Sequence, residues 1–237
     1  MKILVIADHE EKNLWDYWSE ETAVSLSDVE LILSAGDLDA EYLEFLVSML
    51  NIPLVYIHGN HDETYQERPP EGCIDADGRM LDIKCAHGTV RILGLGGSMR
   101  YKDDSPYMFS EKDMQSRMKA LKWTVRKDRI KGRLKGGKSL DILLTHAPCK
   151  GYGDLPDLPH QGFNCFNELL NRQHPGLHVY GHIHREYGRS DSGLDGIRRS
   201  AAGFRRMAVH PSGTTLVNAK GFSVLDYPII DRFIHHR

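Results

Sequence analysis

Short apolar runs recur along this chain, and a polar residue follows each of them closely. The runs are three or four residues long, are rich in Leu, Ile and Val, and lie at residues 3–6, 31–33, 54–57, 142–144 and 177–180. This length and composition are typical of strands buried on both faces. Between the second and third runs, Leu43, Leu46, Val47 and Leu50 recur at helical spacing. Such alternation of strands with helices predicts βαβ crossovers and a largely parallel sheet, so we expect an α/β fold.

The rest of the pattern completes the outline of one domain. Further strands are predicted near residues 80–84, 89–93, 207–210, 215–218 and 223–225. The longest helical candidate covers residues 109–131, with Met, Leu and Val in an apolar stripe. Residues 64–79 are rich in Pro, Gly and Asp and predict a loop on the ligand-binding face. Because no low-complexity linker interrupts the chain, we expect a single domain over residues 1–237.

The polar residues after the apolar runs are of the types that bind metals. The runs are followed in turn by Asp8, Asp37, Asn60, His146, and His182 with His184. Because the carboxyl ends of parallel strands meet at one edge of a sheet, we expect these side chains to converge. Mixed oxygen and imidazole ligands suit first-row divalent metals. The pattern therefore predicts a hydrolase with two metal ions.

Composition and charge narrow the class of protein. Hydrophobic residues make up 41% of the chain, which excludes a disordered protein, and the apolar runs are too short to span a membrane. The chain opens on a strand with no basic leader, so we expect a cytoplasmic protein without a membrane partner. Four cysteines without a C-x-x-C pair favour reduced thiols. Eleven Lys and Arg against two Asp in residues 112–138 make a basic helical segment at about 109–138, either a solvated face or an arm for nucleic acid.

Four motifs together carry a family resemblance: Gly36-Asp37, Gly59-Asn60-His61-Asp62, Thr145-His146-Ala147-Pro148 and Gly181-His182-Ile183-His184. In this order they resemble the calcineurin-like metallophosphoesterases, over residues 2–184. The resemblance implies a sandwich of two mixed β-sheets flanked by helices, a four-layer fold. It also implies a metal-dependent phosphoric ester hydrolase with two divalent ions. We expect Mn²⁺, with Fe, Zn, Ni or Mg as alternatives.

The resemblance also implies a role for each motif residue. The implied ligands are Asp37 as a bridge between both ions, Asn60, His146 and His182 at one position, and Asp8 and His184 at the other. A hydroxide that bridges the ions would attack phosphorus directly. His61 would assist the leaving group, and Asp62 is suited to orienting the His61 ring. Because His61 can help a poor leaving group, we expect a phosphodiester substrate, either a small molecule or a nucleotide.

The opening motif departs from the family pattern. The family usually has Asp-x-His there, whereas this chain has Asp8-His9-Glu10. Because side chains alternate in an extended segment, Asp8 and Glu10 can face the same side while His9 faces away. Either Glu10 is a metal ligand, or the turn twists to admit His9, or this metal position is weak.

Three residues outside the ligand motifs are candidates for contact with substrate. His160 precedes a Gly-Phe pair that resembles an element in one branch of the family, but it could instead cap the helix expected near Asn164. Arg185 and Arg100 lie near motif ends and are candidate phosphate contacts.

Two alternative functions stay open: a binding scaffold with weakened catalysis, and a nuclease that tracks nucleic acid with the basic segment. Nucleic acid is not the favoured partner.

Overall fold

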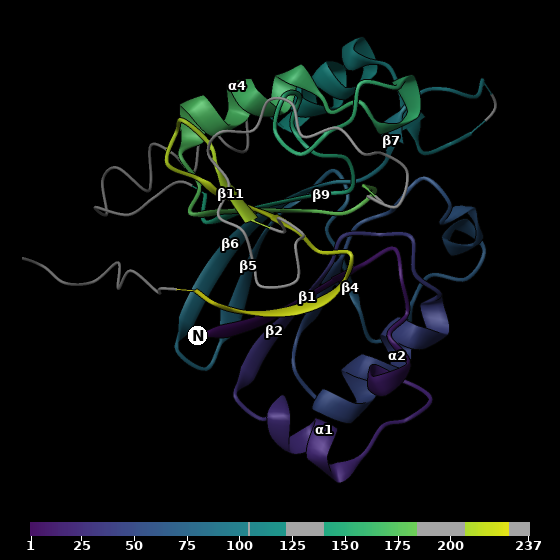
Figure 1. The fold of residues 1–237 in the computed structure, drawn as a ribbon, viewed down its shortest axis with the longest axis vertical. Helices are drawn as coiled ribbons and strands as arrows, with labels where there is room; N and C mark the ends of the chain where they lie inside the picture. Colours follow the sequence, from purple (N-terminus) through teal and green to yellow (C-terminus); the bar gives the residue numbers. More distant parts are fainter. Residues whose placement is uncertain (104, 122–139, 184–206, 228–237) are drawn as a thin grey trace, which may run out of the picture.

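Two β-sheets pack face to face through the centre of the protein, and helices cover their outer faces (Figure 1). The structure is a computed structural model that describes residues 1–103, 105–121, 140–183 and 207–227. The layers run helix, sheet, sheet, helix, which confirms the sandwich of two mixed sheets expected for this chain.

The first sheet has the strand order β13-β1-β2-β3-β4. Its parallel strands are β1 (Lys2–Ala7), β2 (Val29–Ser34), β3 (Leu54–Tyr56) and β4 (Ile74–Asp75), and β13 (Gly221–Asp226) pairs with β1 antiparallel. Helix α2 (Ala40–Leu50) packs on its outer face, and α1 (Glu20–Ser25) and the 3-10 turn η1 (Lys12–Leu14) lie on the same side (Figure 1).

The second sheet has the strand order β11-β12-β10-β9-β6-β5. Its strands are β5 (Met80–Cys85), β6 (Gly88–Leu95), β9 (Ile142–Thr145), β10 (Leu177–Tyr180), β11 (Met207–Val209) and β12 (Thr215–Asn218). The inner four are parallel, and β5 and β11 are antiparallel edges. Helix α4 (Asn164–Gln173) and the helical residues 111–121 pack on the outer face.

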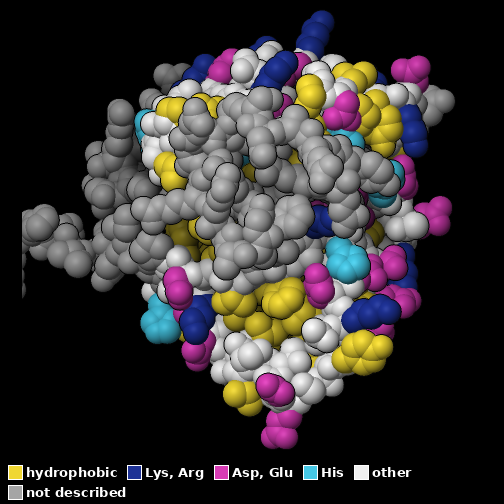
Figure 2. All heavy atoms as spheres, in the orientation of Figure 1, with side chains coloured by type: hydrophobic (Ala, Val, Ile, Leu, Met, Phe, Trp, Pro, Cys, Tyr) yellow, Lys and Arg dark blue, Asp and Glu magenta, His cyan; other side chains and the backbone are white. Residues whose placement is uncertain are grey.

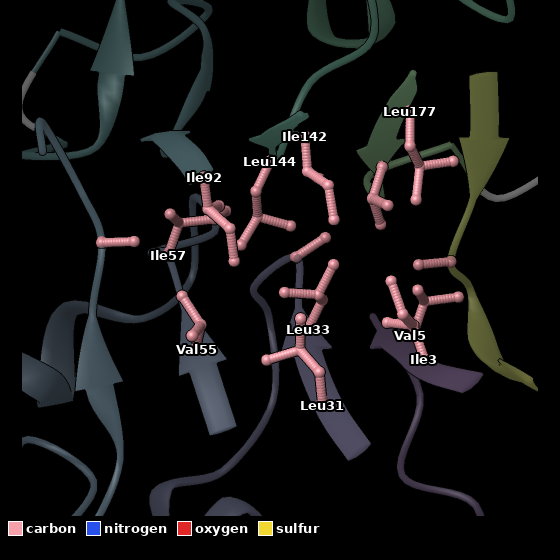
Figure 3. Packing of buried hydrophobic residues seen from close by; sticks show 14 of the residues in the cluster. Ile3, Val5, Leu31, Leu33, Val55, Ile57, Ile92, Ile142, Leu144 and Leu177 are labelled. Carbon is pink, nitrogen blue, oxygen red and sulfur yellow. The ribbon is translucent and has the colours of Figure 1, made fainter. Parts of the chain in front are cut away.

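The core between the sheets explains the unbroken apolar runs. Ile3 and Val5 point inward, toward the residues that Figure 3 shows from the second sheet. Leu4 and Ile6, one position on, point outward and pack in the cluster that contains the residues of α2. Successive side chains of a strand point to opposite faces, so a strand covered on both sides must be apolar throughout. The five predicted strands that precede the polar motifs are confirmed.

Two sequence predictions need correction. The helix predicted from residue 109 begins at residue 111, because Met108–Phe109 form strand β8, which pairs with β7 (Ser98–Met99). Ser110 then caps the helix: its Oγ accepts from the Asp113 amide at 3.2 Å, and Asp113 accepts from the Ser110 amide at 3.0 Å. The loop predicted over residues 64–79 also contains most of the 3-10 turn η2 (Glu63–Gln66) and all of β4.

The basic segment falls mostly outside the described part, which omits residues 122–139. The single domain over residues 1–237 stays a prediction. Figure 2 shows acidic and basic side chains intermingled on the visible part of one face, so the described residues there form no extended patch of one sign. Among the described helices, none is long and apolar enough to cross a membrane.

Candidate metal centre

The predicted ligand residues follow the carboxyl ends of parallel strands from both sheets. Asp8 follows β1, Asp37 lies three residues past β2, and Asn60 four past β3, while His146 follows β9 and His182 lies two past β10. Because the strands within each sheet run parallel, the ligand residues of each sheet lie at one edge of it. The packing of the two sheets then brings the edges together.

Three of these residues have an unusual backbone conformation. Asp8, Asp37 and His182 have positive φ angles of 62°, 57° and 66°. At Asp8 and His182 the next amide donates to the preceding carbonyl, at 2.7 Å and 2.8 Å, which closes a γ-turn with the strained sign of φ. Non-glycine residues seldom adopt this conformation, and such strain concentrates at functional sites.

The prediction that Asp8 and Glu10 face the same side assumed an extended segment, and that assumption is wrong. The γ-turn at Asp8 breaks the alternation of side chains. Instead, Glu10 Oε1 accepts a hydrogen bond from the Asp39 amide at 2.8 Å, and His9 is exposed. The γ-turn at His182 likewise ends the extended segment assumed to align His182 with His184, which lies outside the described residues.

A buried group of side chains forms the centre of the site. Among the described residues, ligand atoms of Asp37, His146 and His182 all lie within 4.8 Å of one another. Asn60 joins them, because its Oδ1 lies 3.0 Å from His146 Nε2. Asn60 and His146 have no exposed surface, and His182 is 6% exposed. One carboxylate, one amide and two imidazoles therefore converge away from water.

His146 shows that this group fits a cation. Its Nδ1 lies 2.7 Å from the Ala35 carbonyl, which only accepts, so Nδ1 carries a proton. Its Nε2 faces two oxygens, Asn60 Oδ1 at 3.0 Å and Asp37 Oδ2 at 3.3 Å. A neutral imidazole would point its lone pair at the Asp37 carboxylate oxygen, so a positive charge between these atoms is favoured.

A second proton on His146 is one source of that charge. Burial alone would lower the pKa of His146, but the Asp37 carboxylate outweighs burial and raises this pKa to about 9. Burial would raise the pKa of Asp37, but the opposing charge of His146 holds it well below its ordinary value. A divalent cation would replace that proton and satisfy all three atoms. The residues present therefore fit a metal ion.

The tautomer of His182 is fixed by a backbone carbonyl. Its Nε2 donates to the Pro159 carbonyl at 2.8 Å, which leaves the lone pair on Nδ1. Burial, together with the nearby His146, lowers the pKa of His182 to about 4, so the ring is neutral at pH 7 and suited to bind metal. The His182 amide donates to both Asp8 carboxylate oxygens at 2.9 Å, so Asp8 is tied to the turn that carries His182.

Asp62 organises the backbone around Asp37. Its Oδ2 accepts from the amides of Gly59 and Asp37 at 2.6 Å and 2.9 Å. Burial and the charge of Asp37 raise the pKa of Asp62 to about 6. The exposed His61 donates its amide to Asp37 Oδ1 at 2.8 Å. Orientation of the His61 ring by Asp62 stays a prediction.

Two glycines of the motifs are required by close packing. A Cβ on Gly36, which has a φ of 92°, would lie 2.3 Å from the Gly59 nitrogen. A Cβ on Gly59 would lie 1.9 Å from Asp37 Oδ1. The two loops therefore approach each other through their glycines, which lets Asp37 lie against the backbone of the Asn60 loop.

The residues predicted to contact substrate lie outside the buried group of ligand residues or outside the described part of the chain. The His160 ring lies beside that of His182, with centroids 5.3 Å apart, in the 3-10 turn η3 (Leu158–His160). Its Nδ1 bonds to Asp157, and the N-cap residue of α4 is Phe163 with no side-chain capping bond, so the alternative in which His160 caps this helix is wrong. The guanidinium of Arg100 pairs with Asp113 at 2.9 Å. Arg185 lies outside the described residues.

Sequence reasoning missed two supports of the ligands. Asp154 accepts from the amides of Gly151 and Gly162 at 2.8 Å and 3.1 Å, and so holds the loop whose Pro159 carbonyl fixes His182. An Asp in a glycine-rich turn is a local signal for such bonds. The second support is the fully buried His178, whose Nε2 lies 2.7 Å from Thr145 Oγ1 beside His146.

The fold and this group define an α/β sandwich with a candidate divalent metal centre. A sequence profile of the calcineurin-like phosphoesterase family matches residues 1–186, and the chain belongs to this family. Two solved structures share the fold over 95% of this chain. One is TT1561 of Thermus thermophilus, with a TM-score of 0.53, 16% identity and 93% of that chain covered. The other has a TM-score of 0.58, 13% identity and 94% of that chain covered.

Curated relatives match over a short stretch. Metallophosphoesterase domain-containing protein 1 of Homo sapiens is 46% identical over 55 residues, which is 22% of this chain and 17% of that protein. UPF0046 protein T07D4.2 of Caenorhabditis elegans is 40% identical over 57 residues, 23% of this chain and 14% of that protein. The matches thus span less than a fifth of either relative.

Proposed function

We propose that the protein is a metal-dependent phosphoesterase that prefers phosphodiesters. The observation that carries the proposal is the buried convergence of His146, His182, Asn60 and Asp37, a mixed nitrogen and oxygen donor set that fits a divalent cation. Membership of the calcineurin-like phosphoesterase family supports the same chemistry.

The chain's own residues would hold two divalent ions. The proposed ligands are Asp8, Asp37, Asn60, His146 and His182, together with His184 from the sequence motif. Mixed nitrogen and oxygen donors suit first-row ions, among which we propose Mn²⁺. When bound, the ions would lower the pKa of a coordinated water toward neutrality and polarise the phosphoryl group.

The residues around this group have separate tasks. His61 is exposed while its backbone is anchored on Asp37, so its ring is available to protonate a leaving alkoxide. His160, beside His182, would contact the phosphoryl group from the η3 turn. Asp62 would keep the Asp37 and Asn60 loops in register through its two amide bonds. His61 supports action on esters with poor leaving groups, because an alkoxide leaves poorly without a proton, and among these esters we propose a diester as the preferred substrate.

The experiment that tests this function is hydrolysis of bis(p-nitrophenyl) phosphate by metal-stripped protein to which Mn²⁺ is added back. The variant is Asn60→Ala, and Asn171→Ala on the exposed face of α4 is the matched control. We expect Mn²⁺-dependent turnover in the wild type and the control. In Asn60→Ala it should fall by more than about 100-fold, because loss of even an outer-shell partner costs 10- to 100-fold.

Comparison with p-nitrophenyl phosphate tests the preference for diesters, which would be wrong if the monoester turned over faster. Wild-type protein that binds Mn²⁺ but hydrolyses neither ester with any divalent ion would contradict an enzymatic role. A binding scaffold would then be the better interpretation.

A further inference from the structure

Glu10 connects two loops of the metal centre. Its Oε1 accepts a hydrogen bond of 2.8 Å from the amide of Asp39, 29 residues away in sequence. Glu10 lies two residues after Asp8, and Asp39 lies two residues after Asp37. The bond therefore joins the loop that carries one proposed ligand to the loop that carries another. A backbone hydrogen bond of 3.1 Å, from the Asp8 amide to the Gly36 carbonyl, joins the same two loops.

The bond also completes the start of helix α2. Asp39 is the N-cap residue of α2, with an extended backbone, and its own side chain makes no capping bond. In a capping box, a Glu within the first turn of the helix accepts from the N-cap amide. Here the Glu comes from the loop after β1 instead. Glu10 thus occupies the acceptor position of a capping box, but from a distant part of the chain.

The two loops that Glu10 joins are both strained. Asp8 and Asp37 have φ angles of 62° and 57°, a conformation that is unfavourable for non-glycine residues and persists only where the surroundings enforce it. A charge-assisted hydrogen bond between the loops offsets part of this strain. The described group whose ligand atoms lie within 4.8 Å of one another contains neither Asp8 nor Glu10. The two carboxylates differ in their partners, because Asp8 accepts from the amide of His182, whereas Glu10 accepts from the N-cap amide of α2.

We propose that Glu10 is a positioning residue, which holds the Asp8 turn against the Asp37 turn through the Asp39 amide, and that it is not a metal ligand. The proposal rests on the proposed function only in that the two turns carry metal ligands. It accounts for a carboxylate at the third position of the opening motif without placing it on the metal.

Comparison of Glu10→Ala with Glu10→Gln separates the two roles. Gln keeps a side-chain oxygen that can accept from the Asp39 amide, but it lacks the carboxylate charge of a metal ligand. Two quantities are measured for each variant: the thermal unfolding midpoint of metal-free protein, and the Mn²⁺ bound per chain at equilibrium dialysis. Asp16→Ala, at an exposed position of the same loop region, is the control.

We expect Glu10→Ala to lower the midpoint by about 2 to 4 °C. It should also weaken Mn²⁺ binding by about 10-fold without changing the number bound at saturation. Glu10→Gln should restore both quantities to near the wild-type and Asp16→Ala values. Loss of one Mn²⁺ per chain in Glu10→Ala would overturn the proposal in favour of a ligand, whether or not Glu10→Gln restores that ion, because an amide oxygen can also bind metal.

The proposal would also be overturned if Glu10→Ala had the midpoint and Mn²⁺ affinity of the wild type, or if Glu10→Gln restored neither quantity. If wild-type protein binds no divalent ion, the proposed function fails, and the midpoints of the metal-free proteins alone then decide whether Glu10 holds the two turns.

Discussion

Replacement of Gly59 by Ala should disable the metal centre through a single methyl group. The added Cβ would lie 1.9 Å from Asp37 Oδ1 and 2.5 Å from the Asp37 nitrogen, where real Cβ atoms keep at least 3.0 Å. The carboxylate must therefore move by about 1 Å or more. That movement breaks the 2.8 Å bond from the His61 amide to Asp37 Oδ1.

The cost follows from these contacts. Overpacking costs about 1–3 kcal/mol, and a broken bond to a charged group adds about 1.5–3 kcal/mol. We expect an unfolding free energy lower by about 2–4 kcal/mol, because part of the clash relaxes by the same movement that breaks the bond. A misplacement of about 1 Å in a catalytic group costs about 100-fold in rate, so Mn²⁺-dependent turnover should fall by that factor.

The assay combines urea unfolding of metal-free protein with Mn²⁺ titration of turnover. Gly213→Ala is the control, since Gly213 has a φ of 85° but no atom within 4 Å of an added Cβ. It should lose about 1 kcal/mol from backbone strain and keep full metal-dependent turnover. The reasoning is refuted if Gly59→Ala matches the wild type in both stability and turnover, because the close approach of the two loops would then not constrain Asp37.

Two further predictions concern supports of the ligands. Burial lowers the pKa of His178 from 6.5 to about 3, so the unfolded chain takes up this proton at higher pH than the folded one, and stability falls as pH drops through that window. The free energy of unfolding, measured in urea at pH 7 and at pH 4.5, should fall between these two pH values by about 2–3 kcal/mol less in His178→Gln than in the wild type. An equal fall in both proteins would contradict a neutral buried His178. Asp154→Ala removes both amide bonds of the loop that fixes His182, so Mn²⁺ affinity by dialysis should fall about 10- to 100-fold, with Asp154→Asn intermediate. Unchanged affinity in Asp154→Ala would show that the loop is held by other contacts.

The strands and the order of the ligand motifs could be predicted because both are local properties of the sequence. A strand covered on two faces is apolar at every position, as at Ile3, Leu4, Val5 and Ile6, and such runs are visible without a structure. The start of the helix after Ser110 could have been predicted by the same local reasoning, because the Ser110–Asp113 capping box is a sequence signal.

The geometry of the site was decided by contacts between distant residues. The alternation assumed for an extended segment does not hold from Asp8 to Glu10, because Asp8 forms a γ-turn that bonds to the loops after β2 and β10. The bond from the His182 amide to Asp8 spans 174 residues in sequence, and the bond from Asp39 to Glu10 spans 29. The sequence by itself determined which residue types follow each strand. Only the packing of two sheet edges decided which atoms face one another, because hydrogen bonds of this kind depend on positions that no local pattern encodes.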